Sequence, residues 1–127
     1  MSIQVDPTDL ARTLDDYGVG YLLSTSSQGR VKAITITARV EGDVVVVPAP
    51  STSTAANLAE NPAATLLFPP LVQGGYTLLV DGSAEADVEG FRFSPASAVL
   101  HRPTTDEDTA SGASDCGQDC VPIRAAN

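Results

Sequence analysis

The two thiols and the single imidazole are the most reactive side chains of this 127-residue chain. Cys116 and Cys120 form a Cys-x-x-x-Cys segment near the carboxyl terminus. Such a pair could form a strained local disulfide, bind a metal ion together with His101 or an acid, or remain as two exposed thiols. A convincing zinc site needs a second pair of ligands, which this sequence does not supply, so two free thiols are the favoured interpretation.

The histidine lies at the end of the last apolar stretch, in Leu100-His101-Arg102-Pro103. A lone histidine at a strand end is usually exposed or hydrogen-bonded, so His101 is only a secondary catalytic candidate. The sequence contains no nucleophile elbow, no phosphate loop of the Gly-Lys-Ser kind and no dinucleotide fingerprint. Nothing in it therefore favours a hydrolase, an NTPase or a Rossmann enzyme.

Charge excludes two further classes of partner. The net charge of the chain is −9, and residues 1–103 carry six basic and eleven acidic side chains, a net of −5. This balance argues against a nucleic-acid or anionic-membrane surface. No stretch approaches the roughly 20 apolar residues of a membrane helix, and no basic, apolar leader opens the chain, so we expect a cytoplasmic protein.

The local patterns predict a mainly β protein, a six-stranded antiparallel barrel with two short helices. One helix begins at the Asp6-Pro7 cap and ends near Tyr17, and the other follows the hydroxyl cluster 51–54 and ends at Asn61-Pro62. The expected strands cover residues 19–25, 30–40, 44–47, 63–68, 76–80 with a bulge at Asp81-Gly82, and 88–100 with an edge or bend at Pro95.

The expected strand 30–40 alternates between two kinds of side chain. Ile34, Ile36 and their even-numbered neighbours form a core face, while Thr35 and Thr37 belong to a polar face. Threonines on such a face could contact a ligand or simply favour the strand, and the pattern does not decide between the two. The run Val44–Val47 indicates a strand covered on both sides, which we expect to require a second subunit.

The chain divides into one folded domain, residues 1–103, and an acidic tail, residues 104–127. Thr104 to Gln118 are rich in Thr, Asp, Ser and Gly and contain no large apolar residue. Such a segment cannot bury enough apolar area to offset the entropy of ordering, so we expect a flexible tail that carries the two cysteines.

Three short motifs resemble the pyridoxamine 5'-phosphate oxidase-like FMN-binding split-barrel superfamily. The most specific is Asn57-Leu58-Ala59-Glu60-Asn61-Pro62, placed after a hydroxyl cluster at the second helix. The others are Gly29-Arg30-Val31-Lys32 at the start of a strand and the segment Val80-Asp81-Gly82-Ser83-Ala84. The resemblance covers about residues 7–103 and leaves out the tail.

The resemblance implies a homodimer that holds FMN, or in actinobacterial branches a deazaflavin coenzyme, between its subunits. In the oxidase proper, four basic residues bind the phosphate; the matching positions here are Lys32, Thr37, Ser53 and Thr54, with Thr52 completing the hydroxyl cluster. Only Lys32 is basic, so the phosphate would receive fewer charge-assisted hydrogen bonds. The expected cofactor residues are Lys32, Thr35, Thr37, Thr52, Ser53, Thr54 and Asn57.

Two functions follow from this resemblance. The first is a flavin- or deazaflavin-dependent oxidoreductase, in which the cofactor carries the hydride chemistry and the protein positions it. The second is a non-catalytic split-barrel dimer that binds a cofactor, another small molecule or nothing. Because basic residues are missing from the phosphate positions, the second function is favoured more here than it would be in a typical member of the superfamily. Fold alone does not determine chemistry.

Overall fold

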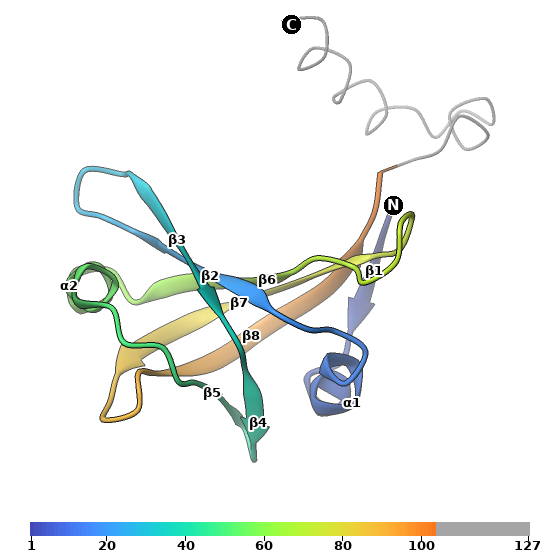
Figure 1. Ribbon diagram of the computed structural model, residues 1–127, viewed down its shortest axis with the longest axis horizontal. Coiled ribbons are helices and arrows are strands. Elements are labelled where there is room, and N and C mark those ends of the chain that lie inside the picture. The colour runs from blue at the N-terminus through green and yellow to red at the C-terminus, as the bar shows by residue number, and fades with distance from the viewer. Residues whose placement is uncertain (104–127) are drawn as a thin grey trace, which may run out of the picture.

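The computed structural model describes residues 1–103, which fold around one antiparallel sheet of eight strands (Figure 1). Neighbouring strands follow the order β3-β2-β6-β7-β8-β5-β4, and β1 pairs with the end of β8. In chain order the strands are β1 (Ser2–Val5), β2 (Gly20–Thr25), β3 (Val31–Ile36), β4 (Arg39–Glu41), β5 (Val44–Val47), β6 (Ala63–Phe68), β7 (Thr77–Ala86) and β8 (Phe91–His101). The expected mainly β, antiparallel class is confirmed.

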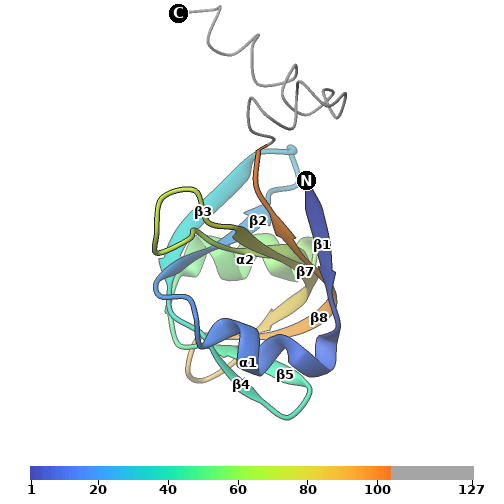
Figure 2. The same ribbon diagram turned by 90° about the vertical axis from the view of Figure 1, so that its right-hand side faces the viewer.

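The sheet curls into a barrel because one bent segment serves both of its ends. β3 is the first strand in the spatial order and β4 the last, yet only residues 37–38 separate them in the chain. β3 pairs with β2, and β4 pairs with β5. Figure 2 looks along the resulting barrel, with α1 near the viewer and α2 behind.

The predicted number of six strands is wrong by two. The expected strand 30–40 is divided into β3 and β4, because its first half pairs with β2 and its second half with β5. The other additional strand is β1, which pairs with β8 from Ser2–His101 to Val5–Ala98. Its side chains are mostly exposed, so its sequence lacks the alternation of apolar and polar residues by which a half-buried strand is predicted.

The predicted bulge lies where it was expected. Between Asp81 and Gly82 the register of β7 against β8 shifts by one residue, so that Gly82 pairs with Pro95. Pro95 follows the part of β8 that pairs with β5 and precedes the part that pairs with β1. On this short unpaired edge a residue without a backbone N–H costs no ladder hydrogen bond.

The two short helices begin at the predicted caps. The Asp6 side chain accepts a hydrogen bond from the Thr8 N–H at the start of a 3-10 turn, Pro7–Asp9, which leads into α1 (Leu10–Leu14). The regular helix is therefore shorter than the expected one, which reached Tyr17. In α2 (Thr52–Glu60), the Ser51 side chain caps the Thr54 N–H, and Asn61-Pro62 follows the last turn.

The core is filled from this one chain. Three phenylalanines, Phe68, Phe91 and Phe93, are fully buried among valines, leucines and Ile36. Val45, Val46 and Val47 are also buried, each at most 2% exposed. The expectation that this strand needs a second subunit to cover it is therefore wrong, because the barrel, its helices and its loops already cover both sides.

The predicted tail, residues 104–127 with Cys116 and Cys120, lies outside the described residues. Within residues 1–103, no helix is long and apolar enough to cross a membrane.

We predict that Gly82→Ala destabilises the fold by about 2–3 kcal/mol, toward the upper part of the range for overpacking. A Cβ at this position would overlap the main-chain oxygen of Ser94 and crowd the Phe93 ring, and the main chain cannot move aside as a side chain can. Urea unfolding measures the change in free energy. Ser83→Ala, at the exposed neighbouring position, is the control and should change stability by less than about 0.5 kcal/mol; equal effects would contradict the argument.

Candidate functional site

The predicted cofactor residues of β3 lie on opposite faces of the strand. Lys32 pairs with Ser24, and two residues further on Ile34 pairs with the buried Leu22, so Lys32 lies on the interior side. Thr35 pairs with Tyr21, and both are exposed on the outer side. Thr37 is exposed in the connection to β4. The alternation predicted for this segment is confirmed, and it separates Lys32 from the two threonines.

Ser24, a residue that sequence reasoning missed, links Lys32 to Asn57 of α2. Ser24, the register partner of Lys32, is only 1% exposed, and the Asn57 Nδ2 amide donates a hydrogen bond of 3.2 Å to its Oγ. This contact places the middle of α2 beside the end of the β2–β3 hairpin. A signal for Ser24 was available, because the alternation of β2 assigns it to the same face as the buried Leu22.

The three consecutive hydroxyls of α2 lie in three different environments. Ser53 is exposed and precedes Asn57 by four residues, so the two are neighbours on one side of the helix. Thr52 instead lines a cleft of about 240 Å³ beside the β7–β8 turn. Thr54 is fully buried, and its Oγ1 accepts a hydrogen bond from the Ser51 hydroxyl. Of the three, only Ser53 is both exposed and a helical neighbour of Asn57.

The cleft at Thr52 is unsuited to a phosphate. Asp87 and Glu89 of the β7–β8 turn line it, and no basic side chain does. The nearby guanidinium of Arg39 is already occupied by Glu41 and Glu89, and these hydrogen bonds raise the pKa of Arg39. Phosphate binding beside Thr52 would thus place like charges together.

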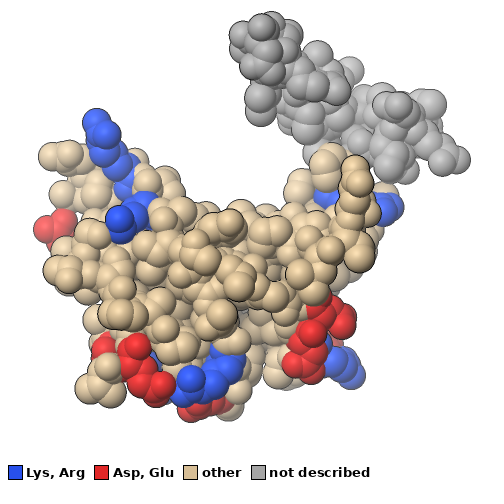
Figure 3. All heavy atoms as spheres, viewed as in Figure 1, with Lys and Arg blue, Asp and Glu red and all other residues tan. Residues whose placement is uncertain are grey.

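The end of the β2–β3 hairpin is basic, whereas the cleft at Thr52 is acidic. Arg30 and Lys32 lie there without an ion pair to any residue of the described part of the chain, and basic atoms protrude at this end in Figure 3. Lys32, the Ser53 hydroxyl and the Asn57 amide together offer an ammonium and neutral donors. Such groups are donors that bind phosphate oxygens, and only the ammonium among them is charged.

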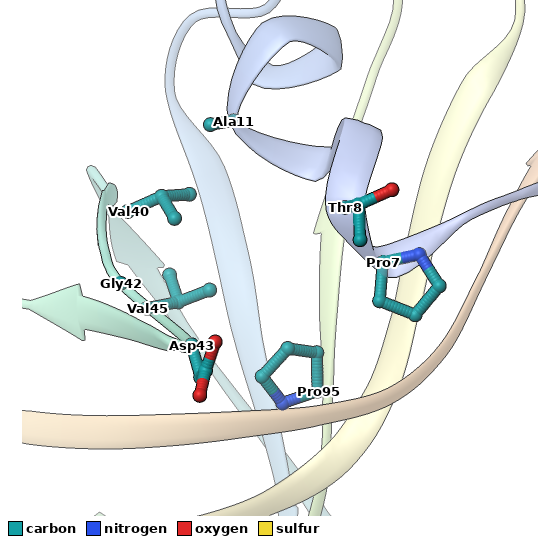
Figure 4. A pocket seen from close by; sticks show the side chains of 8 residues that line it. All are labelled: Pro7, Thr8, Ala11, Val40, Gly42, Asp43, Val45 and Pro95. Carbon is teal, nitrogen blue, oxygen red and sulfur yellow. The ribbon is translucent and has the colours of Figure 1, made fainter.

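A separate cavity of about 270 Å³ lies between the start of the first helical segment and the β4–β5 turn (Figure 4). Val40 and Val45 point into it, and Asp43 lies beside Pro95 at its margin. The Thr8 hydroxyl points away from the valines and donates to Asp6. Asp43 is the only ionised side chain among the lining residues, so this cavity cannot hold an anionic cofactor.

The remaining reactive candidate is His101. Its Nδ1 lies 3.1 Å from the Ser2 hydroxyl, in the register pair that joins β1 to β8. This is a hydrogen-bonded histidine at a strand end. Within residues 1–103, no group of three or more His, Cys, Asp or Glu side chains could hold a metal ion.

Solved structures share this arrangement of strands. A crystal structure of an FAD-binding protein from Mesorhizobium loti has a TM-score of 0.61 and 12% sequence identity, covering 80% of this chain and 99% of that one. An FAD-binding protein from Mycobacterium smegmatis has a TM-score of 0.58 at 13% identity, covering 80% of this chain and 100% of that one. An F420 reductase has a TM-score of 0.56 at 12% identity, covering 71% and 94%. At such identities the likeness establishes the fold.

Relatives in sequence extend along nearly the whole chain. An uncharacterised protein of Mycobacterium bovis is 33% identical over 134 residues, covering 93% of this chain and 94% of the relative, and one of Mycobacterium tuberculosis matches equally. The chain belongs to the family of these mycobacterial proteins, and it shares its fold with the FAD-binding proteins and the F420 reductase. No family model matches the sequence.

The split-barrel fold explains why the resemblance was visible in the string 57–62. Asn57 docks α2 onto Ser24, and Leu58 is buried in the core. The Pro62 oxygen accepts a hydrogen bond from the Ala84 N–H and thereby fixes the entry to β6. The string therefore combines a helix, its docking contact and its exit in six residues.

We predict that Asn57→Ala costs about 1–3 kcal/mol of stability, because it leaves the buried Ser24 hydroxyl without its partner. Ser24→Ala should cost less, since the half-buried Asn57 amide can turn toward water. A double-mutant cycle by urea unfolding should give a coupling of about 0.5–1.5 kcal/mol. Ser53→Ala, on the same side of α2 but exposed, is the control; additive effects of the Ser24 and Asn57 changes would refute the contact.

Proposed function

We propose that this protein is a flavin- or deazaflavin-dependent oxidoreductase that holds the phosphate of its cofactor between the β2–β3 hairpin and α2. The observation that carries the proposal is the meeting of Lys32 with Asn57 at Ser24. It brings the one basic residue that matches the family beside the family's most specific string. Two structural neighbours are FAD-binding proteins and a third is an F420 reductase, which supports a cofactor of this type.

In the proposed site, Lys32 supplies the positive charge, and Ser53 and Asn57 supply neutral hydrogen-bond donors. The N–H groups of Thr52 and Ser53, in the first turn of α2, have no intrahelical acceptor and are further donors at this end. Thr54 is omitted because it is buried, and Thr52 contributes through its main chain only, because its side chain lines the acidic cleft. A bound flavin or deazaflavin would supply the hydride transfer, while the protein binds and orients it.

A second function has its own supporting observation. Three of the four basic positions of the oxidase carry hydroxyl residues here, and two carboxylates line the cleft at the start of α2. Both features weaken phosphate binding relative to the oxidase. A non-catalytic dimer that binds a small molecule is therefore the alternative function, and direct cofactor titration distinguishes the two.

The cofactor site of this superfamily requires two subunits, and one surface fits that role. Tyr21, Leu67, Leu79 and Val99 are directly paired across β2, β6, β7 and β8, so they form one apolar row on the outer face. Tyr21 is 38% exposed and the other three are half-buried. Figure 3 shows no charged side chain across the centre of the face toward the viewer. We propose that a second copy of the chain covers this row, with Thr35 at its margin beside Tyr21.

We predict a homodimer at micromolar concentration that Leu79→Lys converts into a monomer, because a buried lysine without a partner charge opposes association. Sedimentation velocity measures the two states. Val88→Lys, at a fully exposed position of the β7–β8 turn, is the control and should remain dimeric. A monomeric unmodified protein would contradict both the dimer and a cofactor site between subunits.

We also predict that Lys32→Ala weakens FMN binding by about 1.5–3 kcal/mol, roughly 10- to 150-fold, because it removes the charge-assisted bond to the phosphate. Riboflavin, which has no phosphate, should bind almost as before. Quenching of flavin fluorescence measures both affinities, and Arg92→Ala, an exposed cation on β8, is the control.

Equal losses for FMN and riboflavin would mean that Lys32 acts through the fold. If the unmodified protein binds neither FMN nor a deazaflavin, and shows no flavin absorbance after purification, the non-catalytic function replaces the enzyme.

A further inference from the structure

A second cleft lies at the end of the barrel remote from α2. It has a volume of about 390 Å³, within the range of small-molecule sites, and lies between the end of α1 and the β6–β7 loop. Its apolar walls are formed mainly by Tyr17, Pro70, Leu71, Val72, Tyr76 and Leu100. Leu71 and Val72 are adjacent apolar side chains with exposed fractions of 71% and 69%.

The loop that carries these exposed residues is held in one conformation. The Tyr17 hydroxyl donates a 2.8 Å hydrogen bond to the Tyr76 oxygen, and the Gly75 N–H bonds the Val72 oxygen. A Cβ at Gly75 would lie 2.9 Å from the Pro70 Cβ, so the two arms of the loop are in close contact. Burial, followed by the charge of Asp16, raises the pKa of Tyr17, which keeps its hydroxyl protonated as the donor. Leu71 and Val72 are therefore presented on a formed wall, which lowers the entropic cost of binding.

The charge of the cleft selects a class of ligand. Asp16 is the only carboxylate among the lining residues, and none of them is basic. The guanidinium of Arg102, which is not among them, lies 4.8 Å from the centroid of the Tyr76 ring. Anions are thus disfavoured, whereas a group with an N–H donor can bind the Asp16 carboxylate while an attached ring system lies against the apolar walls.

The cleft is also separate from the proposed phosphate site. Gly18, which adjoins Leu71, and Ser24, the partner of Lys32, are six residues apart along an extended segment, roughly 20 Å. One ligand of ordinary size therefore cannot occupy both sites of the same chain.

We propose that this cleft, formed by α1, the β6–β7 loop and Leu100, is a binding site for an aromatic amine, with the rings between Tyr17 and Leu71–Val72 and the nitrogen toward Asp16. The site is distinct from the proposed phosphate site of the same chain, and it does not depend on the proposed oxidoreductase function.

A matched pair of fluorescent probes tests this proposal on the full-length protein. N-phenyl-1-naphthylamine carries two aromatic systems and one N–H, and 1-anilinonaphthalene-8-sulfonate has the same skeleton with an added sulfonate. The amine should bind with enhanced fluorescence, and the sulfonate at least about tenfold more weakly, because Asp16 repels it. The double change Leu71→Ser and Val72→Ser should weaken amine binding at least about tenfold through lost apolar contact.

Four further variants make the test specific. Asp16→Asn should reduce the discrimination between the two probes, whereas Val88→Ser, a distant exposed site, and Lys32→Ala should leave amine binding unchanged. Equal affinity of the two probes would overturn the proposal. So would amine binding that weakens in Tyr21→Ser but not in the Leu71→Ser and Val72→Ser double variant. It would also be overturned if amine binding weakens as the protein concentration rises, since a second copy would then cover the cleft.

Discussion

One bent segment, residues 31–41, forms both ends of the sheet and so determines the shape of the molecule. β3 bonds to β2 and β4 bonds to β5, and only two residues join β3 to β4, so the chain itself brings the two edge strands of the sheet together. A sheet closed in this way has a defined interior, which Phe68, Phe91 and Phe93 fill. The pairing also assigns each side chain of the segment to the interior or to the outer surface.

The proposed cofactor site depends on that assignment. The β2–β3 hairpin extends past the filled interior, so an inward-facing position near its end, that of Lys32, is only half-buried. A lysine can keep its charge there while its stem packs against the strand. The Ser24–Asn57 hydrogen bond then places α2 against the same end, and the exposed Ser53 lies one helical turn before Asn57. A polar contact in the core thus positions a polar site at its margin.

Each of the three hollows described above, within residues 1–103, is lined by at least one carboxylate. Asp87 and Glu89 line the cleft at Thr52, Asp43 lies at the cavity of Figure 4, and Asp16 lines the cleft under the β6–β7 loop. Arg30 and Lys32 place two cations without an ion pair in residues 1–103 at the end of the β2–β3 hairpin, which suits an anion, whereas the acid-lined hollows favour neutral or cationic groups. The phosphate and amine proposals address different parts of the molecule for this reason.

The sequence by itself determined what depends on neighbouring residues: the caps at Asp6 and Ser51, the stop at Asn61-Pro62, the alternation of residues 31–40 and the bulge at Gly82. Each follows from the dihedral limits or hydrogen bonds of a few consecutive residues. The tertiary structure decided how the segments pair. It divided residues 30–40 into two strands, added β1, covered Val45–Val47 within one chain and sent Thr52, Ser53 and Thr54 into three environments. Such outcomes depend on contacts between residues far apart in the chain, and no local pattern encodes which partner a strand or helix side will meet.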